Sequence, residues 1–239
     1  MNHNVTIVLR GDTFRPVTDG NKFPDINMKI GKSNLESEIN QIFCLKSIYH
    51  FIILPFIKKK YEINIVGVIY EFEKNNIIRN FFSEKKISNN IIEISRQDSS
   101  QNTTMLKALE RAVFLTNPEL FIVLRLDLSF IKEIPINILC KNKIAYPHRN
   151  CYSPHWHPKN GIGDHLFVIG CERINMFLHA IKSLKTGYNL HNICKYLDLG
   201  DTIALFENDN SDKLFYIDLQ RMSKKMEYIK IREDLEKIF

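Results

Sequence analysis

Short β-branched apolar runs alternate along the chain with segments whose apolar residues follow helical spacing. The predicted strands cover residues 5–9, 61–71, 91–94, 119–128, 143–146, 165–170, 202–207 and 214–217. The predicted helices cover residues 33–55, 101–115, 172–184 and 190–197, with 75–82 as a helix or an irregular connection. This alternation predicts an α/β fold with a mainly parallel central sheet flanked by helices on both faces. Ligands of such sheets bind beyond the carboxyl ends of the strands.

The length and composition predict one folded domain over residues 1–239. Of the 239 residues, 44% are apolar and 25% are charged, which excludes a disordered chain. The five cysteines are an odd number without a C-x-x-C pair, so we expect free thiols in a reducing compartment. The apolar run 48–57 is about half the ~20 residues of a membrane-spanning helix. Met1–Asn4 shows no start of a secretory signal, so we expect a cytoplasmic protein without a membrane span.

The net charge of +6 raises the question of a nucleic-acid partner. The lysines are scattered over predicted helix faces, and aromatic residues do not interleave with them as a stacking platform requires. The abundance of isoleucine, asparagine and lysine is also typical of an AT-rich coding sequence. We therefore expect no nucleic-acid partner and regard three arginines, Arg10, Arg15 and Arg125, as the informative part of the charge.

The first candidate site segment follows the first predicted strand. It contains Arg10 and Gly11, with Arg15 close behind. A glycine at this position lets the backbone approach a ligand, and the two arginines suit a phosphate group. The chain has neither G-x-G-x-x-G nor a Walker sequence, so this segment does not predict a dinucleotide-binding or P-loop protein.

The second candidate segment is the end of the predicted strand 119–128, where Arg125 and Asp127 stand. A carboxylate at the end of a buried strand suits Mg²⁺ or Mn²⁺ bridging two phosphates, since these ions take only one or two protein carboxylates. Asp127 is therefore the candidate metal ligand. The alternative is an internal ion pair between Arg125 and Asp127 that orders the end of the strand.

The third candidate segment is the loop 147–165, which holds four of the eight histidines and the only tryptophan. We expect His155, Trp156 and His157 to contact a sugar or nucleotide, with a zinc site or local packing as alternatives. At the end of the loop stand Asp164 and His165. Asp164 is placed to take a proton from an acceptor hydroxyl, unless it only caps a turn.

These segments together resemble a known family. The strand that ends in R-G-x-x-x-R, the run LFIVLRLDLSF, the Pro/His-rich loop and the run GDHLFVIGCERINMF resemble GT-A-type glycosyltransferases of bacterial and viral glycan synthesis. The resemblance covers about residues 5–185 and rests on short motifs. It implies transfer of a sugar from a nucleotide-sugar donor to a hydroxyl of a glycan acceptor.

The resemblance also implies roles for single residues. It places Asp127 as the last acid of the D-x-D element that holds the metal and donor diphosphate, and Arg10 and Gly11 at the nucleotide. Asp164 matches the base, while about 1–130 forms the nucleotide-binding half and about 131–239 the acceptor half. Position 125 is Arg, so the full D-x-D is absent. The resemblance implies Mn²⁺ or Mg²⁺ as cofactor. The alternative is that Arg125 itself offsets the charge of the diphosphate.

Two other functions fit the same residues. A metal-dependent hydrolase would use the histidine-rich loop together with Asp164 and would contain stoichiometric metal. A non-catalytic glycan-binding or protein-binding module would retain the fold without turnover. The glycosyltransferase is the leading prediction, with His155, Trp156, His157 and His165 as the acceptor or substrate loop.

Overall fold

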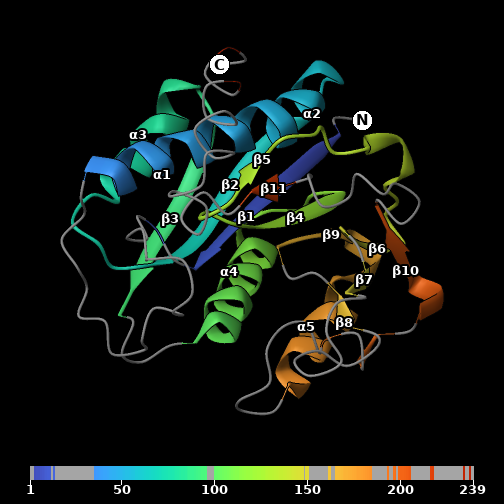
Figure 1. Cartoon of the computed structure of the whole chain (residues 1–239). Coiled ribbons are helices and arrows are strands. Elements are labelled where there is room, and N and C mark those ends of the chain that lie inside the picture. Colours follow the sequence, from blue (N-terminus) through green and yellow to red (C-terminus); the bar gives the residue numbers. More distant parts are fainter. Residues whose placement is uncertain are drawn as a thin grey trace.

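A seven-stranded sheet forms the centre of the computed structural model (Figure 1). The structure describes residues 3–11, 13, 35–95, 100–147, 149–150, 161–162, 165–184, 193, 196–197, 199–205, 216–217, 234 and 237. The strands of the sheet are β1 (Asn4–Gly11), β2 (Glu62–Tyr70), β3 (Ser88–Ile94), β4 (Leu120–Arg125), β6 (Ile144–Tyr146), β9 (Leu166–Gly170) and β10 (Thr202–Ala204). Their order is β10-β6-β9-β4-β1-β2-β3, and only β9 runs antiparallel to its neighbours.

Two short strand pairs lie outside this sheet. β5 (Ser129–Phe130) pairs with β11 (Tyr216–Ile217), and β7 (Arg149–Asn150) pairs with β8 (Gly161–Ile162). The β7–β8 pair joins the two ends of the histidine-rich loop. Residues 151–160 of this loop lie outside the described part of the chain.

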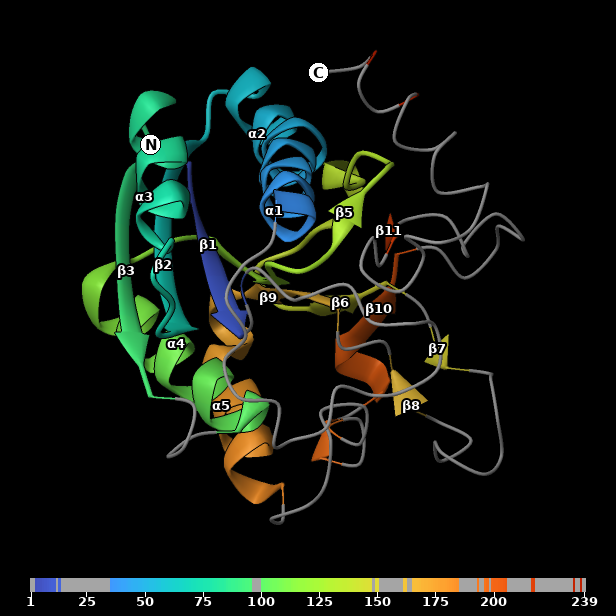
Figure 2. The ribbon, with the colours of Figure 1, turned by 60° about the vertical axis from the view of Figure 1, so that its left-hand side comes forward.

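Helices cover both faces of the sheet (Figure 2). One face carries α1 (Leu35–Ser47), the π-helical turn η1 (Ile48–Ile53), α2 (Leu54–Lys58) and α3 (Asn76–Glu84), and the other carries α4 (Gln101–Leu115) and α5 (Ile174–Ser183). Among the described residues, the short 3-10 turns η2 (Ile136–Ile138), η3 (Cys171–Arg173) and η5 (Leu199–Asp201) lie in the connections. The expected α/β class with a mainly parallel, helix-flanked sheet is confirmed.

The alternation of side chains along the central strands separates two apolar layers. Ile7 and Leu9 of β1 pack in the layer beneath α1 and α3, whereas Val8 packs in the layer beneath α4 and α5. The same alternation in β4 places Ile122 in the first layer and Val123 in the second. Buried on both faces, β1 and β4 are the innermost strands, and their carboxyl ends lie side by side.

The first long helix differs from the prediction at its end. We expected it to stop near Pro55, but helical structure continues through η1 and α2 to Lys58. Pro55 lies in the first turn of α2, where a missing amide hydrogen costs little, and so it does not end the helix. The described span Ser37–Lys58 is apolar and long enough to cross a bilayer, but 67% of its most apolar window is buried inside the molecule. This helix therefore serves as a core helix in the structure.

Candidate functional site

Two arginines stand side by side at the carboxyl ends of the innermost strands. Arg10 of β1 is the register partner of Arg125 of β4. Both lie two residues after a valine of the α4 layer, Val8 and Val123, so both side chains belong to that face of the sheet. Neighbouring strands are about 4.8 Å apart, so the two arginines occupy adjacent backbone positions at the sheet edge. His165, the residue just before β9, adjoins them, and its carbonyl oxygen lies 3.4 Å from the Arg125 amide nitrogen.

Asp127 forms a two-point ion pair with Arg125. The Arg125 Nε atom donates to Oδ1 of Asp127 at 2.9 Å, and Nη2 donates to Oδ2 at 2.6 Å. The side chain of Asp127 is 2% exposed and that of Arg125 is 13% exposed. Two parallel hydrogen bonds fix the plane of the guanidinium as well as its distance. Of the two interpretations drawn from the sequence, the internal ion pair is the contact that the structure contains.

Helix α1 holds the segment that carries Asp127. Gln41 donates from Nε2 to the carbonyl oxygen of Leu126 at 2.9 Å, and Ser47 Oγ accepts the amide of Phe130 at 3.0 Å. Both polar side chains are buried, at positions of α1 that face the end of β4. These hydrogen bonds therefore anchor the backbone on either side of Asp127. Burying the polar groups costs little free energy, because the donor and the acceptor of each bond satisfy one another.

The end of β1 is held in a similar way. Gly11 has φ +88°, a conformation in which a side chain would be strained. Beyond it, Thr13 donates from Oγ1 to Oδ1 of Asn75 at 2.8 Å, and Asn75 donates from Nδ2 to the carbonyl oxygen of Tyr70 at 2.8 Å. These bonds tie the chain after β1 to the turn after β2. The predicted turn at Gly11 thus lies at the same sheet edge as Arg10 and Arg125.

The structure places only part of the predicted site. Arg10, Gly11, Arg125, Asp127 and His165 come together at the carboxyl edge of the sheet. The other five predicted site residues fall outside the described residues: Arg15, His155, Trp156, His157 and Asp164. Their roles in binding donor or acceptor remain predictions.

Three buried polar residues that support the site were missed by the sequence analysis. Gln41, Thr13 and Asn75 are each buried and hydrogen-bonded across the fold. Gln41 offered a signal, since a polar residue stands there among the apolar positions of a predicted core helix. Asn75 begins the segment 75–82, predicted as a helix or an irregular connection, and Thr13 lies between the predicted strand 5–9 and the predicted helix 33–55. Polar residues are ordinary at both positions, so neither carried a signal.

Of the described residues at this edge, the candidate metal ligand Asp127 is held by Arg125. Both carboxylate oxygens of Asp127 already accept hydrogen bonds from Arg125, and a cation there would lie beside a positive guanidinium. Mn²⁺ and Mg²⁺ require carboxylate oxygens that face the ion. In the part of the chain that the structure describes, no three or more His, Cys, Asp or Glu side chains gather as a metal site would need.

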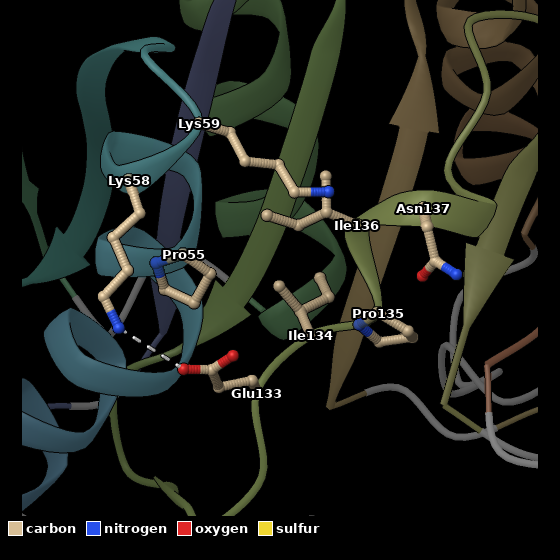
Figure 3. Close-up of a pocket in the computed structure, with 8 residues that line it drawn as sticks. All are labelled: Pro55, Lys58, Lys59, Glu133, Ile134, Pro135, Ile136 and Asn137. Carbon is tan, nitrogen blue, oxygen red and sulfur yellow. Dashed lines mark ion pairs between the residues drawn. The ribbon is translucent and has the colours of Figure 1, made fainter.

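A pocket of about 380 Å³ lies elsewhere, between the end of α2 and the segment 133–137 (Figure 3). Its walls are mostly apolar, and Lys58 forms an ion pair with Glu133 across 3.8 Å. Lys58 and Lys59 precede the first residue of β2, so the pocket lies toward the amino ends of the parallel strands. It is separate from the arginine site, which occupies the opposite edge.

Comparison with known proteins gives likenesses of fold alone. No protein-family model matches the chain, and no curated protein matches it. Among solved structures, the glycosyltransferase GlyE of Streptococcus pneumoniae TIGR4 is similar, with 12% identity and a TM-score of 0.47 over 86% of this chain. The match covers 45% of GlyE, so the chain spans less than half of that protein.

Two further similar structures are also transferases. The galactosyltransferase LgtC, solved with donor and acceptor sugar analogs, has 9% identity and a TM-score of 0.45 over 84% of this chain and 72% of its own. The inositol-1-phosphate CTP transferase from T. maritima has 12% identity and a TM-score of 0.48 over 94% of this chain and 98% of its own. Solved glycosyltransferases, the family that the sequence resembles, are thus found among the similar structures together with nucleotidyltransferases.

Proposed function

We propose that this chain is a transferase that takes a nucleotide-activated sugar as donor and a glycan hydroxyl as acceptor. The observation that supports the proposal is that Arg10 and Arg125 lie in register at the carboxyl ends of β1 and β4. This is the edge where open α/β sheets bind their ligands. Two guanidiniums on one face suit the phosphates of a nucleotide better than an uncharged ligand.

In the proposed reaction, the bond between the anomeric carbon of the sugar and the donor phosphate breaks. The acceptor oxygen forms the new bond to that carbon, and the nucleotide leaves with both bonding electrons. Arg125, held by Asp127, stabilises the charge that develops on the leaving phosphate. Asp164 is our candidate for the base that takes the acceptor proton, and residues 155–157 for contacts to the sugars.

Calorimetric titration of the full chain with UDP-, GDP- and CMP-sugars tests the donor. We expect one of these to bind, and Asp164→Asn to keep that affinity while slowing transfer about 10²–10⁴-fold, the usual loss of a general base. Glu71→Gln removes an exposed acid just beyond β2 at the same sheet edge and serves as the matched control, with unchanged transfer.

Other results of measurements on the same purified protein distinguish the alternative functions. Failure of every nucleotide-sugar to bind contradicts the proposal. Binding of CTP or dTTP in preference to any nucleotide-sugar indicates a nucleotidyltransferase. Stoichiometric zinc in the purified protein, measured by elemental analysis, favours the hydrolase, and glycan binding without turnover favours the non-catalytic module.

A further inference from the structure

We infer that the amino edge of the sheet, opposite the arginine site, is a docking surface for a membrane that carries anionic lipids. Exposed lysines and exposed apolar side chains gather at this edge, where helices α2, α3 and α4 end. The surface consists of residues 57–60, 85–86 and 113–115, and we call it the lysine edge. The inference goes beyond the proposed function and does not depend on it.

The topology brings the three helix ends to one edge of the sheet. Helices α2, α3 and α4 lead into β2, β3 and β4, which are parallel to one another and to β1, so all three helices end where these strands begin. One turn before the end of α4, Arg111 donates to the side chain of Asn90 at 2.9 Å, and Asn90 stands four residues after Lys86. Just beyond α4, the Thr116 hydroxyl accepts a hydrogen bond from Thr6 of β1 at 2.9 Å. The end of α4 therefore lies beside the starts of β1 and β3.

The lysine edge carries more positive than negative charge. Its five lysines, at 58–60 and 85–86, are all exposed. Lys58 lies 3.8 Å from Glu133, and two more exposed acids of the described chain, Glu62 and Glu84, stand at the start of β2 and the end of α3. Three of the lysines form no ion pair with any described residue: Lys59, Lys60 and Lys86. The lysines, which are scattered along the sequence, thus outnumber the acids at this edge of the folded chain.

Two of these lysines stand where glycine would be more stable. Lys60 and Lys86 both have positive φ angles, and each stands two residues before a strand. A lysine there strains the backbone, and its attraction to the negative end of the helix offsets only part of the cost. Strained residues are typical of functional sites. The repeated lysine therefore favours a role for positive charge at this edge.

Apolar side chains are exposed at the same edge. Phe114, in the last turn of α4, is 87% exposed, which is the highest value among the large apolar residues that the structure describes. Val113 and Leu115 beside it are also exposed, and so is Ile57, which directly precedes the lysine run. Four of the six exposed large apolar residues in the described part of the chain thus lie at the lysine edge. These side chains gain free energy when a partner removes them from water.

The combination of lysine and exposed apolar side chains fits a membrane better than other partners of a basic surface. Lysines contact anionic headgroups, while apolar side chains enter the boundary between headgroups and acyl chains. Protein–protein interfaces are depleted of lysine, and single-stranded nucleic acid needs several aromatic residues along a basic groove. Strand β1 is eight residues long, so the arginine site lies roughly 25 Å from the lysine edge and stays accessible in the docked protein.

Co-sedimentation of the full chain with lipid vesicles tests the inference. The vesicles are made of phosphatidylcholine alone, or with about one third phosphatidylglycerol to supply negative charge. We expect binding to the anionic vesicles at about 0.1 M salt, and binding at least about tenfold weaker at about 0.5 M salt, because salt screens the lysines. We expect little binding to phosphatidylcholine alone. Equal binding to both kinds of vesicle, or binding to neither, would overturn the inference.

The double variant Lys60→Gly/Lys86→Gly removes two charges without weakening the fold, since both positions have positive φ angles. We expect it to bind anionic vesicles about 25-fold more weakly, about fivefold for each lysine. Lys107→Gln is the matched control, because Lys107 is exposed in the middle of α4 and away from the helix end. We expect this control to change binding by less than about twofold. Wild-type binding by the double variant contradicts the assignment of the lysine edge.

Phe114→Ser tests the apolar contribution. Because this side chain is 87% exposed, we expect the variant to fold as the wild type does and to bind anionic vesicles about ten- to a hundredfold more weakly. Ile42→Ser changes an apolar residue of α1 that is 38% exposed and should bind as the wild type does. Unchanged binding by Phe114→Ser would overturn the membrane assignment.

Two further measurements distinguish a membrane from other occupants. Tighter binding to duplex DNA or RNA than to anionic vesicles would overturn the inference in favour of a nucleic acid. A dimer in sedimentation velocity that Phe114→Ser dissociates would overturn it in favour of a second copy of this chain. We expect neither result.

Discussion

At the scale of single residues, the buried pair Arg125–Asp127 is the most consequential contact. A buried charge is costly unless a partner of opposite sign and hydrogen bonds compensate it. Here each side chain supplies that compensation for the other, at 2.9 and 2.6 Å. The stability of the strand end and the geometry of the site therefore depend on the same two hydrogen bonds.

Removing one partner should cost far more than removing both. We expect Asp127→Ala to lower the free energy of unfolding by about 3–5 kcal/mol, because it leaves the Arg125 charge buried without its carboxylate. The apolar pair Arg125→Met/Asp127→Leu should lie within about 1 kcal/mol of wild type, since both charges leave together. Urea unfolding at pH 7 measures both. A loss below about 1 kcal/mol for Asp127→Ala would show that water already solvates Arg125.

At the scale of elements, two helices of the sheet end in the same unusual way. Lys60 after α2 has φ 64°, and Lys86 after α3 has φ 58°. Each is the left-handed residue of a Schellman-type cap, in which the amide of Tyr61 donates to the carbonyl of Phe56 and that of Ile87 donates to the carbonyl of Phe82. Glycine is the usual residue at this left-handed position, because a side chain is strained there.

Glycine at these two lysines should therefore stabilise the protein. We expect Lys60→Gly and Lys86→Gly each to raise the free energy of unfolding by about 0.5–1 kcal/mol, since relief of strain exceeds the added freedom of the unfolded chain. Lys59→Gly is the matched control: its φ is −90°, so the same change should destabilise by about 0.5–1 kcal/mol. Thermal and urea unfolding of the three variants measure the effect, and equal losses in all three would contradict the argument.

At the scale of the whole molecule, acidic residues join distant segments at both edges of the sheet. Burial alone would raise the pKa of Glu93, but hydrogen bonds from Asn75, Arg79 and the Phe72 amide outweigh it and lower the pKa. Burial would likewise raise the pKa of Glu119, but hydrogen bonds from Lys141 and His3 outweigh it. The pKa of Glu119 is therefore also lowered.

Both shifts predict a loss of stability in acid. A carboxylate whose pKa is lower in the folded protein stabilises it above the ordinary value of 4.5, and this stabilisation disappears as the pH falls below 4.5 through the folded-state pKa. The free energy of unfolding should therefore decrease below pH 4.5. In Glu93→Gln/Glu119→Gln the decrease should be smaller, while Glu84→Gln, which changes an exposed acid of α3, should leave the pH profile as in wild type. Identical profiles for the double variant and wild type would refute the assignment.

Local patterns in the sequence were sufficient for most elements. Helix α4 covers Gln101–Leu115 as predicted, because its apolar spacing begins beside Ser100, whose side chain accepts the Thr103 amide. Strand β3 begins at Ser88, three residues before its predicted start. Its first residues are polar on an edge strand, so no apolar alternation marks them.

The sequence alone was enough for the α/β class and for Arg10, Arg125 and Asp127 as residues near the carboxyl ends of two strands, although the predicted strand 119–128 extends three residues beyond the end of β4 at Arg125. These are local properties, since strand and helix periods are expressed within about ten residues. The register of Arg10 with Arg125, the ion pair of Asp127 with Arg125 and the hydrogen bond from Gln41 of α1 to Leu126 are seen only in the folded structure. Strand register and helix docking join residues 85 to 115 positions apart, and they depend on the packing of the whole core, which no local pattern encodes.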